Sequence, residues 1–292
     1  MADDFTRPDW VDPVRFPFAS HGFTTPVGRM HYVDEGSGPP VVMLHGNPTW
    51  SFLYRHLIDA LAPDYRCVAP DYIGLGLSDK PADWSYRPPE HAAHVEALIT
   101  KLGLDDITLV VHDWGGPIGL SYALRHPENV RRLIVTNTWM GPLDGDPWIA
   151  LFSRVMGGPL GRVLIERFNA FARLVLPMAF ADRRRLDPMA FRHYLKPLAD
   201  APRTGSWVFP RALLGETEWL RALASRRDRL ADKPALIAWG MRDPAFRPHY
   251  LRQWQSLFSD ATVHRLPVGH YVAEEAGADL APLVRDFLAA TD

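Results

Sequence analysis

Three residues of this sequence have the types and the chain order that covalent hydrolysis requires. Asp113 follows a short apolar run and precedes two glycines, Asp243 follows a second apolar run, and His270 lies near the C-terminus. A carboxylate is already ionised at pH 7, so Asp113 is suited to displace a leaving group at saturated carbon and form an ester. His270 would then activate the water that hydrolyses this ester, with Asp243 fixing the tautomer and orientation of the imidazole.

Two neutral hydrogen-bond donors accompany the acid. The indole N–H of Trp114 is adjacent to Asp113 in the chain, and the side-chain amide of Asn47 follows the apolar run 41–44. Such donors stabilise a leaving group that departs with negative charge. Because neither donor is Arg or Lys, the pair suits a halide better than a phosphate or a carboxylate. The backbone N–H groups of Asn47 and Trp114 are the expected oxyanion hole for hydrolysis of the ester.

Each of these positions also has a structural interpretation. Asp113 could cap the N-terminus of a helix, and Trp114 could be a core residue. Asp243 precedes a proline and could form a turn, whereas His270 is one of twelve histidines. The predicted strands and helices around these residues are therefore needed to decide whether their roles are catalytic or structural.

The residues around Asp113 predict a turn from a strand into a helix. The apolar run 107–111 is typical of a buried strand, and the pattern over 117–124 is typical of a helix. This strand–turn–helix is the nucleophile elbow, in which a sharp turn exposes one side chain above the sheet. Asp243 and His270 also follow predicted strands, and the chain order nucleophile, acid, histidine is that of an α/β hydrolase.

The remaining pattern predicts an α/β fold with a mostly parallel central sheet flanked by helices. Short apolar runs alternate with helical patterns of 10 to 15 residues, which indicates βαβ units. The predicted strands cover 28–36, 41–44, 67–69, 107–111, 133–136, 235–240 and 262–266, and the predicted core helices cover 51–61 (with Ser51 as its cap), 89–102, 117–124, 248–258 and 278–290.

The alternation stops in the middle of the chain. Residues 140–213 contain helical patterns at 148–156, 160–174 and 188–198 and no candidate strand. We therefore expect a core domain made of residues 1–139 and 214–292, with residues 140–213 inserted as an all-helical cap.

Composition limits the other functions. The net charge is −2, without the basic excess of a nucleic-acid or anionic-membrane binder. The chain has neither a signal-peptide pattern nor ~18 consecutive apolar residues, and Cys67 is its one cysteine. We expect a cytoplasmic protein that uses no cofactor and no metal, since no ligand cluster has suitable spacing. It could be a monomer or a homo-oligomer.

From about Phe18 to the C-terminus, the sequence resembles the haloalkane dehalogenases. Four segments carry the likeness: HGNPT at 45–49, DYIGLGLSDKP at 71–81, VHDWGG at 111–116 and GHYVAEE at 269–275. The resemblance implies a halide site formed by Asn47 and Trp114, and hydrolysis of haloalkanes to alcohol, halide and proton through an ester on Asp113. One branch of the family carries its acid 24 residues after the nucleophile, where this chain has Asn137. Asp243 is then the acid, as in the Asp-His-Asp branch.

Other activities share parts of this pattern. Epoxide hydrolases have a similar triad, but use cap tyrosines and usually carry a large apolar or aromatic residue at the position of Asn47. Here the cap contains only Tyr194, in a helical stretch that favours a packing role. A cofactor-free luciferase-like monooxygenase and a non-catalytic ligand-binding homologue remain further alternatives.

Overall fold

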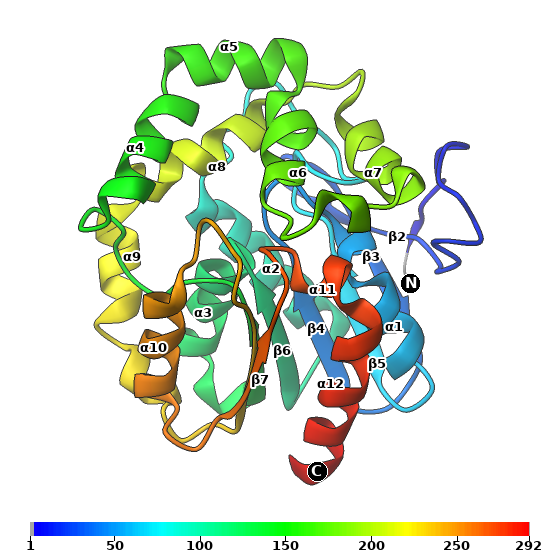
Figure 1. The fold of residues 1–292 in the computed structure, drawn as a ribbon. Coiled ribbons are helices and arrows are strands. Elements are labelled where there is room, and N and C mark those ends of the chain that lie inside the picture. Colours follow the sequence, from blue (N-terminus) through cyan, green and yellow to red (C-terminus); the bar gives the residue numbers. More distant parts are fainter. Residues whose placement is uncertain (1–2, 292) are drawn as a thin grey trace.

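The computed structural model describes residues 3–291, which form one nine-stranded sheet and the helices around it (Figure 1). The strand order is β1-β2-β3-β5-β4-β6-β7-β8-β9. Strands β4 to β9 pair in parallel. At one edge of the sheet, β1, β2 and β3 each pair antiparallel with their neighbours. The chain therefore has the predicted α/β-hydrolase fold with a mostly parallel sheet.

The strands are β1 (Asp3–Asp4), β2 (His21–Thr25), β3 (Gly28–Glu35), β4 (Pro40–Leu44), β5 (Arg66–Pro70), β6 (Ile107–His112), β7 (Val130–Thr136), β8 (Ala235–Gly240) and β9 (Thr262–Leu266). The α-helices are α1 (Arg55–Leu61), α2 (Pro88–Leu102), α3 (Gly115–Arg125), α4 (Pro147–Met156), α5 (Pro159–Phe168), α6 (Leu176–Met178), α7 (Pro188–Leu195), α8 (Thr204–Gly215), α9 (Thr217–Ala224), α10 (Pro248–Leu257), α11 (Val272–Glu275) and α12 (Gly277–Thr291).

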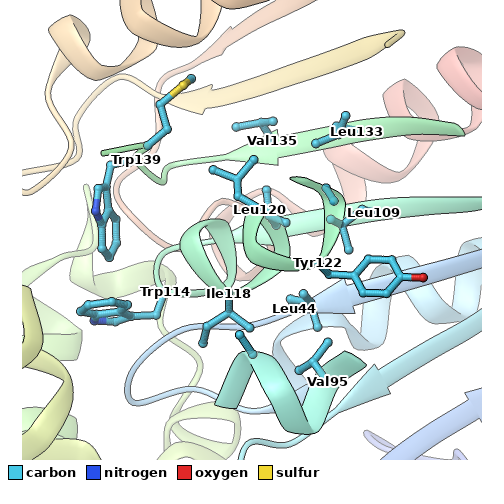
Figure 2. Packing of buried hydrophobic residues seen from close by; sticks show 14 of the residues in the cluster. Leu44, Val95, Leu109, Trp114, Ile118, Leu120, Tyr122, Leu133, Val135 and Trp139 are labelled. Carbon is cyan, nitrogen blue, oxygen red and sulfur yellow. The ribbon is translucent and has the colours of Figure 1, made fainter. Parts of the chain in front are cut away.

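The two faces of the sheet bury separate hydrophobic clusters. Successive side chains of a strand point to opposite faces. Accordingly, Leu109 and Val111 of β6 pack into one cluster with helices α2, α3 and α10, while Val110 packs into the other with α1 and α12. Figure 2 shows the first cluster, with Ile118 of α3 and Val95 of α2 beside the strands. Because both faces are covered, the residues that can meet a ligand are those beyond the strand ends.

Between β7 and β8 the described chain contains helices and loops, and α4 to α8 lie above the carboxyl ends of the strands (Figure 1). The predicted continuous helix over 160–174 is wrong. Helix α5 ends at Phe168 because Asn169 takes the left-handed conformation, with φ of 53°, and a π-helical turn then covers Phe171–Val175. Asn is one of the few residues that stop a helix in this way.

Several smaller differences also come from tertiary contacts. The role of Ser51 as a helix cap is wrong: its hydroxyl is buried without a partner, and its backbone N–H instead donates to Asp71 at 2.7 Å. Strand β2 and helices α8 and α9 are additional to the predicted elements, and residue 213 falls inside α8.

A buried ion pair ties the core to the helices above it. The two terminal guanidinium nitrogens of Arg55 donate to Glu274, at 2.6 and 2.7 Å, and the two side chains are only 8% and 4% exposed. The Tyr194 hydroxyl donates to the same carboxylate. Helices α1, α7 and α11 therefore meet at one desolvated charge pair.

Candidate active site

Asp113 lies directly after β6 in a strained turn. Its φ is 49°, a backbone conformation that residues other than glycine rarely adopt. The turn is crowded: a Cβ atom on Gly46 would lie 2.0 Å from Asp113 Oδ1, and one on Gly115 would lie 1.9 Å from the Leu44 carbonyl oxygen. Glycines at these two positions let the loop after β4 and the start of α3 close around the carboxylate.

The Asp113 side chain does not cap helix α3. The N-cap position of this helix is Trp114, and no side chain accepts a hydrogen bond there. Instead, Asp113 Oδ1 accepts a hydrogen bond from the backbone N–H of Asn47 at 2.9 Å, and the backbone N–H of Trp114 also donates to the carboxylate. The two backbone N–H groups named as the expected oxyanion hole thus both contact the Asp113 carboxylate.

His270 lies between the two acids. Its Nε2 atom is 3.7 Å from Asp113 Oδ2, and its Nδ1 atom is 2.8 Å from Asp243 Oδ2. All three residues come from loops at the carboxyl ends of β6, β8 and β9. The structure thus brings the three predicted residues together, with His270 5% exposed and the Asp113 side chain 13% exposed.

Asn137 holds Asp243 in place. Its Nδ2 atom donates to Asp243 Oδ2 at 2.7 Å and to the Gly240 carbonyl oxygen at 3.1 Å, while its Oδ1 atom accepts from the Gly240 N–H at 2.7 Å. The other carboxylate oxygen of Asp243 accepts from the Ala245 N–H at 2.7 Å. Asn137 therefore joins the ends of β7 and β8 and orients the acid. The sequence identified this position only as one that lacks an acid.

The charges of Asp113 and His270 affect each other's pKa. Burial raises the pKa of Asp113, against the opposing effects of His270 and of the two backbone N–H donors. Burial acts to lower the pKa of His270, but the charge and hydrogen bond of Asp243, together with the charge of Asp113, outweigh it and raise that pKa. The protonated state of His270 thus depends partly on the charge of Asp113.

His112 is a further neighbour that the sequence reasoning missed. Its ring lies 4.6 Å from the ring of His270 between centroids, and it is 1% exposed. Burial lowers the pKa of His112 well below its usual range, so it packs against His270 as a neutral ring. A histidine inside the apolar strand β6 was the available signal.

Trp114 and Asn47 both line the cavity that contains Asp113. The Trp114 ring packs edge-on against Trp139, 4.8 Å between centroids, and both rings are visible in Figure 2. The Asn47 amide donates from Nδ2 to the Ser206 carbonyl oxygen of α8 at 3.1 Å, which assigns the amide nitrogen because a carbonyl only accepts. One N–H of Asn47 is thus engaged with α8, and the second is the donor left for a ligand.

The cavity is large and apolar. It has a volume of about 510 Å³, and Asn47, Asp113, Trp114 and His270 contribute polar groups to its lining. Most of the remaining wall is aliphatic or aromatic, contributed by α4, the turn after α5, and the Pro244–Phe246 loop. Such a site takes an apolar ligand with one reactive polar end.

The fold and the site define an α/β hydrolase with a carboxylate at the elbow. Residues 39–276 match the family model of the alpha/beta hydrolase fold. Haloalkane dehalogenase 2 of Mycobacterium bovis is 40% identical over 279 residues, which cover 94% of this chain and 96% of the relative. The chain belongs to the haloalkane dehalogenase family.

Other relatives share most of the chain. The haloalkane dehalogenase DatA from Agrobacterium tumefaciens C58 superposes with a TM-score of 0.82 at 27% identity, covering 94% of this chain and 97% of that one. A cis-3-alkyl-4-alkyloxetan-2-one decarboxylase of Shewanella oneidensis is 36% identical over 287 residues, which cover 94% of this chain and 90% of the relative. The same scaffold therefore occurs in proteins named for two reactions.

Proposed function

We propose that this protein hydrolyses carbon–halogen bonds of haloalkanes, giving an alcohol, a halide ion and a proton. The observation that carries the proposal is the position of Asp113. Its carboxylate accepts hydrogen bonds from the backbone N–H groups of Asn47 and Trp114, while Oδ2 faces His270 at 3.7 Å. The cavity around it is lined by the side chains of Trp114 and Asn47.

In the first step, the Asp113 carboxylate attacks the halogen-bearing carbon. A carbon–oxygen bond forms, the carbon–halogen bond breaks, and the halide takes the bonding electron pair. The N–H groups of Trp114 and Asn47 stabilise the departing anion. The wall of the cavity is mostly apolar, so few protein groups compete with the substrate for the Asp113 carboxylate.

In the second step, water attacks the carbonyl carbon of the Asp113 ester. His270 accepts a proton from this water through Nε2, and the backbone N–H groups of Asn47 and Trp114 receive the negative charge of the tetrahedral intermediate. Collapse of the intermediate breaks the bond between this carbon and the alkoxy oxygen, which leaves as the alcohol with the remaining hydroxyl proton and regenerates the carboxylate. His270 then releases the proton that it took from the water to the solvent. Because esterification removes the negative charge of Asp113, it also removes one of the charges that keep His270 protonated, so the imidazole becomes a base when the ester needs one.

Epoxide hydrolysis is the less favoured activity. Its cap tyrosine has no counterpart here, because Tyr194 is 1% exposed and donates to Glu274 outside the cavity lining. Tyr194 therefore has the packing role that the sequence favoured.

A second candidate is decarboxylation of a cis-3,4-dialkyloxetan-2-one, the reaction for which two relatives at 36% and 37% identity are named. The volume of the cavity supports this second candidate. At ~30 Å³ per water-sized group, a volume of about 510 Å³ corresponds to about 17 non-hydrogen atoms, which is more than a small haloalkane supplies. Two alkyl chains on a four-membered lactone would fill that space.

We further propose that residues 140–213 act as the substrate-binding cap and that the protein works in the cytoplasm. Cap residues form much of the cavity wall, which supports the first point. The one cysteine, Cys67, is buried and free, as is usual in a reducing compartment.

One comparison separates these reactions. Bromide release and acidification with 1-bromobutane or 1,2-dibromoethane should exceed any diol formation from styrene oxide and any carbon dioxide and alkene formation from a cis-3,4-dialkyloxetan-2-one. A lactone rate far above the bromide rate would make the second candidate the function. Mass spectrometry of a His270→Ala variant should show an alkyl adduct on Asp113. Unmodified variant protein beside an active wild type would exclude the covalent route.

A further inference from the structure

The cap segment, defined here as residues 140–213, carries an unusual surface. Ten large apolar side chains are well exposed in the described part of the chain, and nine of them belong to this segment. They are Trp148, Leu151, Val155, Leu160, Val163, Phe168, Leu174, Met178 and Met189. Single exposed apolar residues are normal, whereas a group concentrated on one lobe marks an interaction surface.

These side chains share helix faces. Trp148, Leu151 and Val155 follow one another at intervals of three and four residues, so they lie on the same side of α4. Helix α4 packs against α5, where Leu160 is 66% exposed and Val163 is 48% exposed. The apolar surface of the cap segment thus extends over two adjacent helices, at the far end of the molecule from the sheet (Figure 1).

The cavity of the active site reaches this surface. Five of the exposed side chains also line the cavity: Trp148, Leu151, Val155, Leu174 and Met178. A ligand entering from this side passes between them on its way to Asp113.

The cap segment is also basic. It contains eleven Lys and Arg but six Asp and Glu, an excess of five positive charges, while the rest of the chain has an excess of seven negative charges. Arg154, Arg167 and Arg173 are exposed and form no ion pair within residues 3–291. Arg167 follows Val163 by four residues, so it lies on the same face of α5. The whole-chain charge of −2, from which we expected no binding to an anionic membrane, averages over these two parts and does not describe the cap segment.

The geometry suits a helix pair that lies on a bilayer surface. Within residues 3–291 no single helix is long and apolar enough to cross a membrane, and α4 and α5 reach that composition only together, bent by 61°. Each has ten residues, about 15 Å of helix, against the ~30 Å of a hydrocarbon core. Apolar helices flanked by arginines instead rest at the interface of an anionic membrane.

We infer that the cap segment docks on the surface of an anionic lipid bilayer, with α4 and α5 in the interface and the cavity mouth facing the acyl chains. A bilayer is favoured over a second copy of the chain because two cap surfaces would bring like charges together. A protein seated on the cap would also close the mouth, whereas lipid leaves it open to a substrate dissolved in the membrane.

Flotation with vesicles tests the docking. The wild type should float with vesicles of equal parts phosphatidylglycerol and phosphatidylcholine, less with phosphatidylcholine alone, and less at about 0.5 M salt. A triple R154Q/R167Q/R173Q variant should partition about a hundredfold more weakly, from about fivefold per arginine. Failure of the wild type to float on anionic vesicles would overturn the inference.

Apolar substitutions separate lipid binding from self-association. Leu160 and Phe168 lie outside the cavity lining, so an L160E/F168E variant should lose flotation yet keep its activity on 1-bromobutane. Val14, 86% exposed on the N-terminal arm, gives the matched control V14E, which should float like the wild type. Light scattering could instead show that the wild type is a dimer and that L160E/F168E is a monomer. If the wild type also failed to float, the surface would be assigned to a second copy of the chain.

Delivery of substrate from the bilayer rests on the proposed function and has its own readout. Bromide release from 1-bromohexadecane held in anionic vesicles should fall at least tenfold in L160E/F168E, with no such fall for 1-bromobutane in solution. Equal rates on the vesicle-held substrate would contradict delivery from the bilayer. Flotation without any bromide release would retain the docking and reject the proposed reaction.

Discussion

Replacing Trp114 by Phe isolates the contribution of one N–H group to carbon–halogen cleavage. The ring is 2% exposed and contacts Trp139 and Phe209, with centroids 4.8 and 5.4 Å away. Phenylalanine retains an aromatic ring against both neighbours but has no donor for the departing halide. A hydrogen bond to a charged group is worth about 1.5–3 kcal/mol, so cleavage should slow by about 10- to 150-fold.

The matched control is Trp139→Phe. The Trp139 indole N–H is buried without a partner, and Trp139 does not line the cavity, so the same chemical change there removes no contact with substrate. Halide formation should be followed in a single turnover with excess enzyme and 1,2-dibromoethane, which reports the cleavage step without product release. The Trp139 variant should stay within about threefold of the wild type. A Trp114 variant that also stays within threefold, or equal losses in both variants, would refute the assignment of a halide donor.

Four further outcomes are expected. Burial raises the pKa of Asp113, so the acid limb of kcat/KM should lie above the range in which an ordinary aspartate titrates, and bromide release that stays constant down into that range would contradict this. Asp113→Asn removes a negative charge 3.7 Å from His270 Nε2, so NMR titration should give His270 a lower pKa than in the wild type; an unchanged or higher value would argue against the coupling. Glu274→Gln leaves its buried guanidinium partner uncompensated and should cost about 3–5 kcal/mol in urea unfolding, with a loss below about 1 kcal/mol showing that the pair is better solvated than its burial implies. Asn137→Ala frees Asp243, so hydrolysis of the ester should slow about tenfold and alkyl-enzyme should accumulate in quenched-flow mass spectrometry, whereas a slower first step would assign Asn137 another role.

The parts of the fold that follow from local pattern could be predicted from the sequence. Strand β6 and helix α3 were recognised because an apolar run ends at glycines and a helical pattern follows. Two chain-distant residues, Asp243 and His270, were placed by their positions after predicted strands, since the carboxyl ends of parallel strands meet at one edge of the sheet. The antiparallel strand β2, near one edge of the sheet, is short and mixes buried with exposed residues, so its pattern does not predict a strand.

The cap segment was the least predictable part. Its helices have apolar residues on several sides, because some side chains face the cavity, some face the core and others face solvent. Periodicity alone therefore extended α5 through Asn169, and it also left α8 unassigned. The Asn47 contact with Ser206 of α8 joins residues 159 positions apart, and no local pattern reports such a pair.

The sequence alone determined which groups are present and where each one falls along the chain: an acid at a strand-to-helix turn, an indole beside it, and an acid and a histidine after later strands. Local backbone preference is sufficient for that, because it depends on neighbouring residues. The tertiary structure decided that Asp113 Oδ2 lies 3.7 Å from His270, that Asn137 orients Asp243, and that the cavity opens among exposed apolar side chains of a basic cap segment. These features depend on how distant elements pack and on which side chains packing leaves in water.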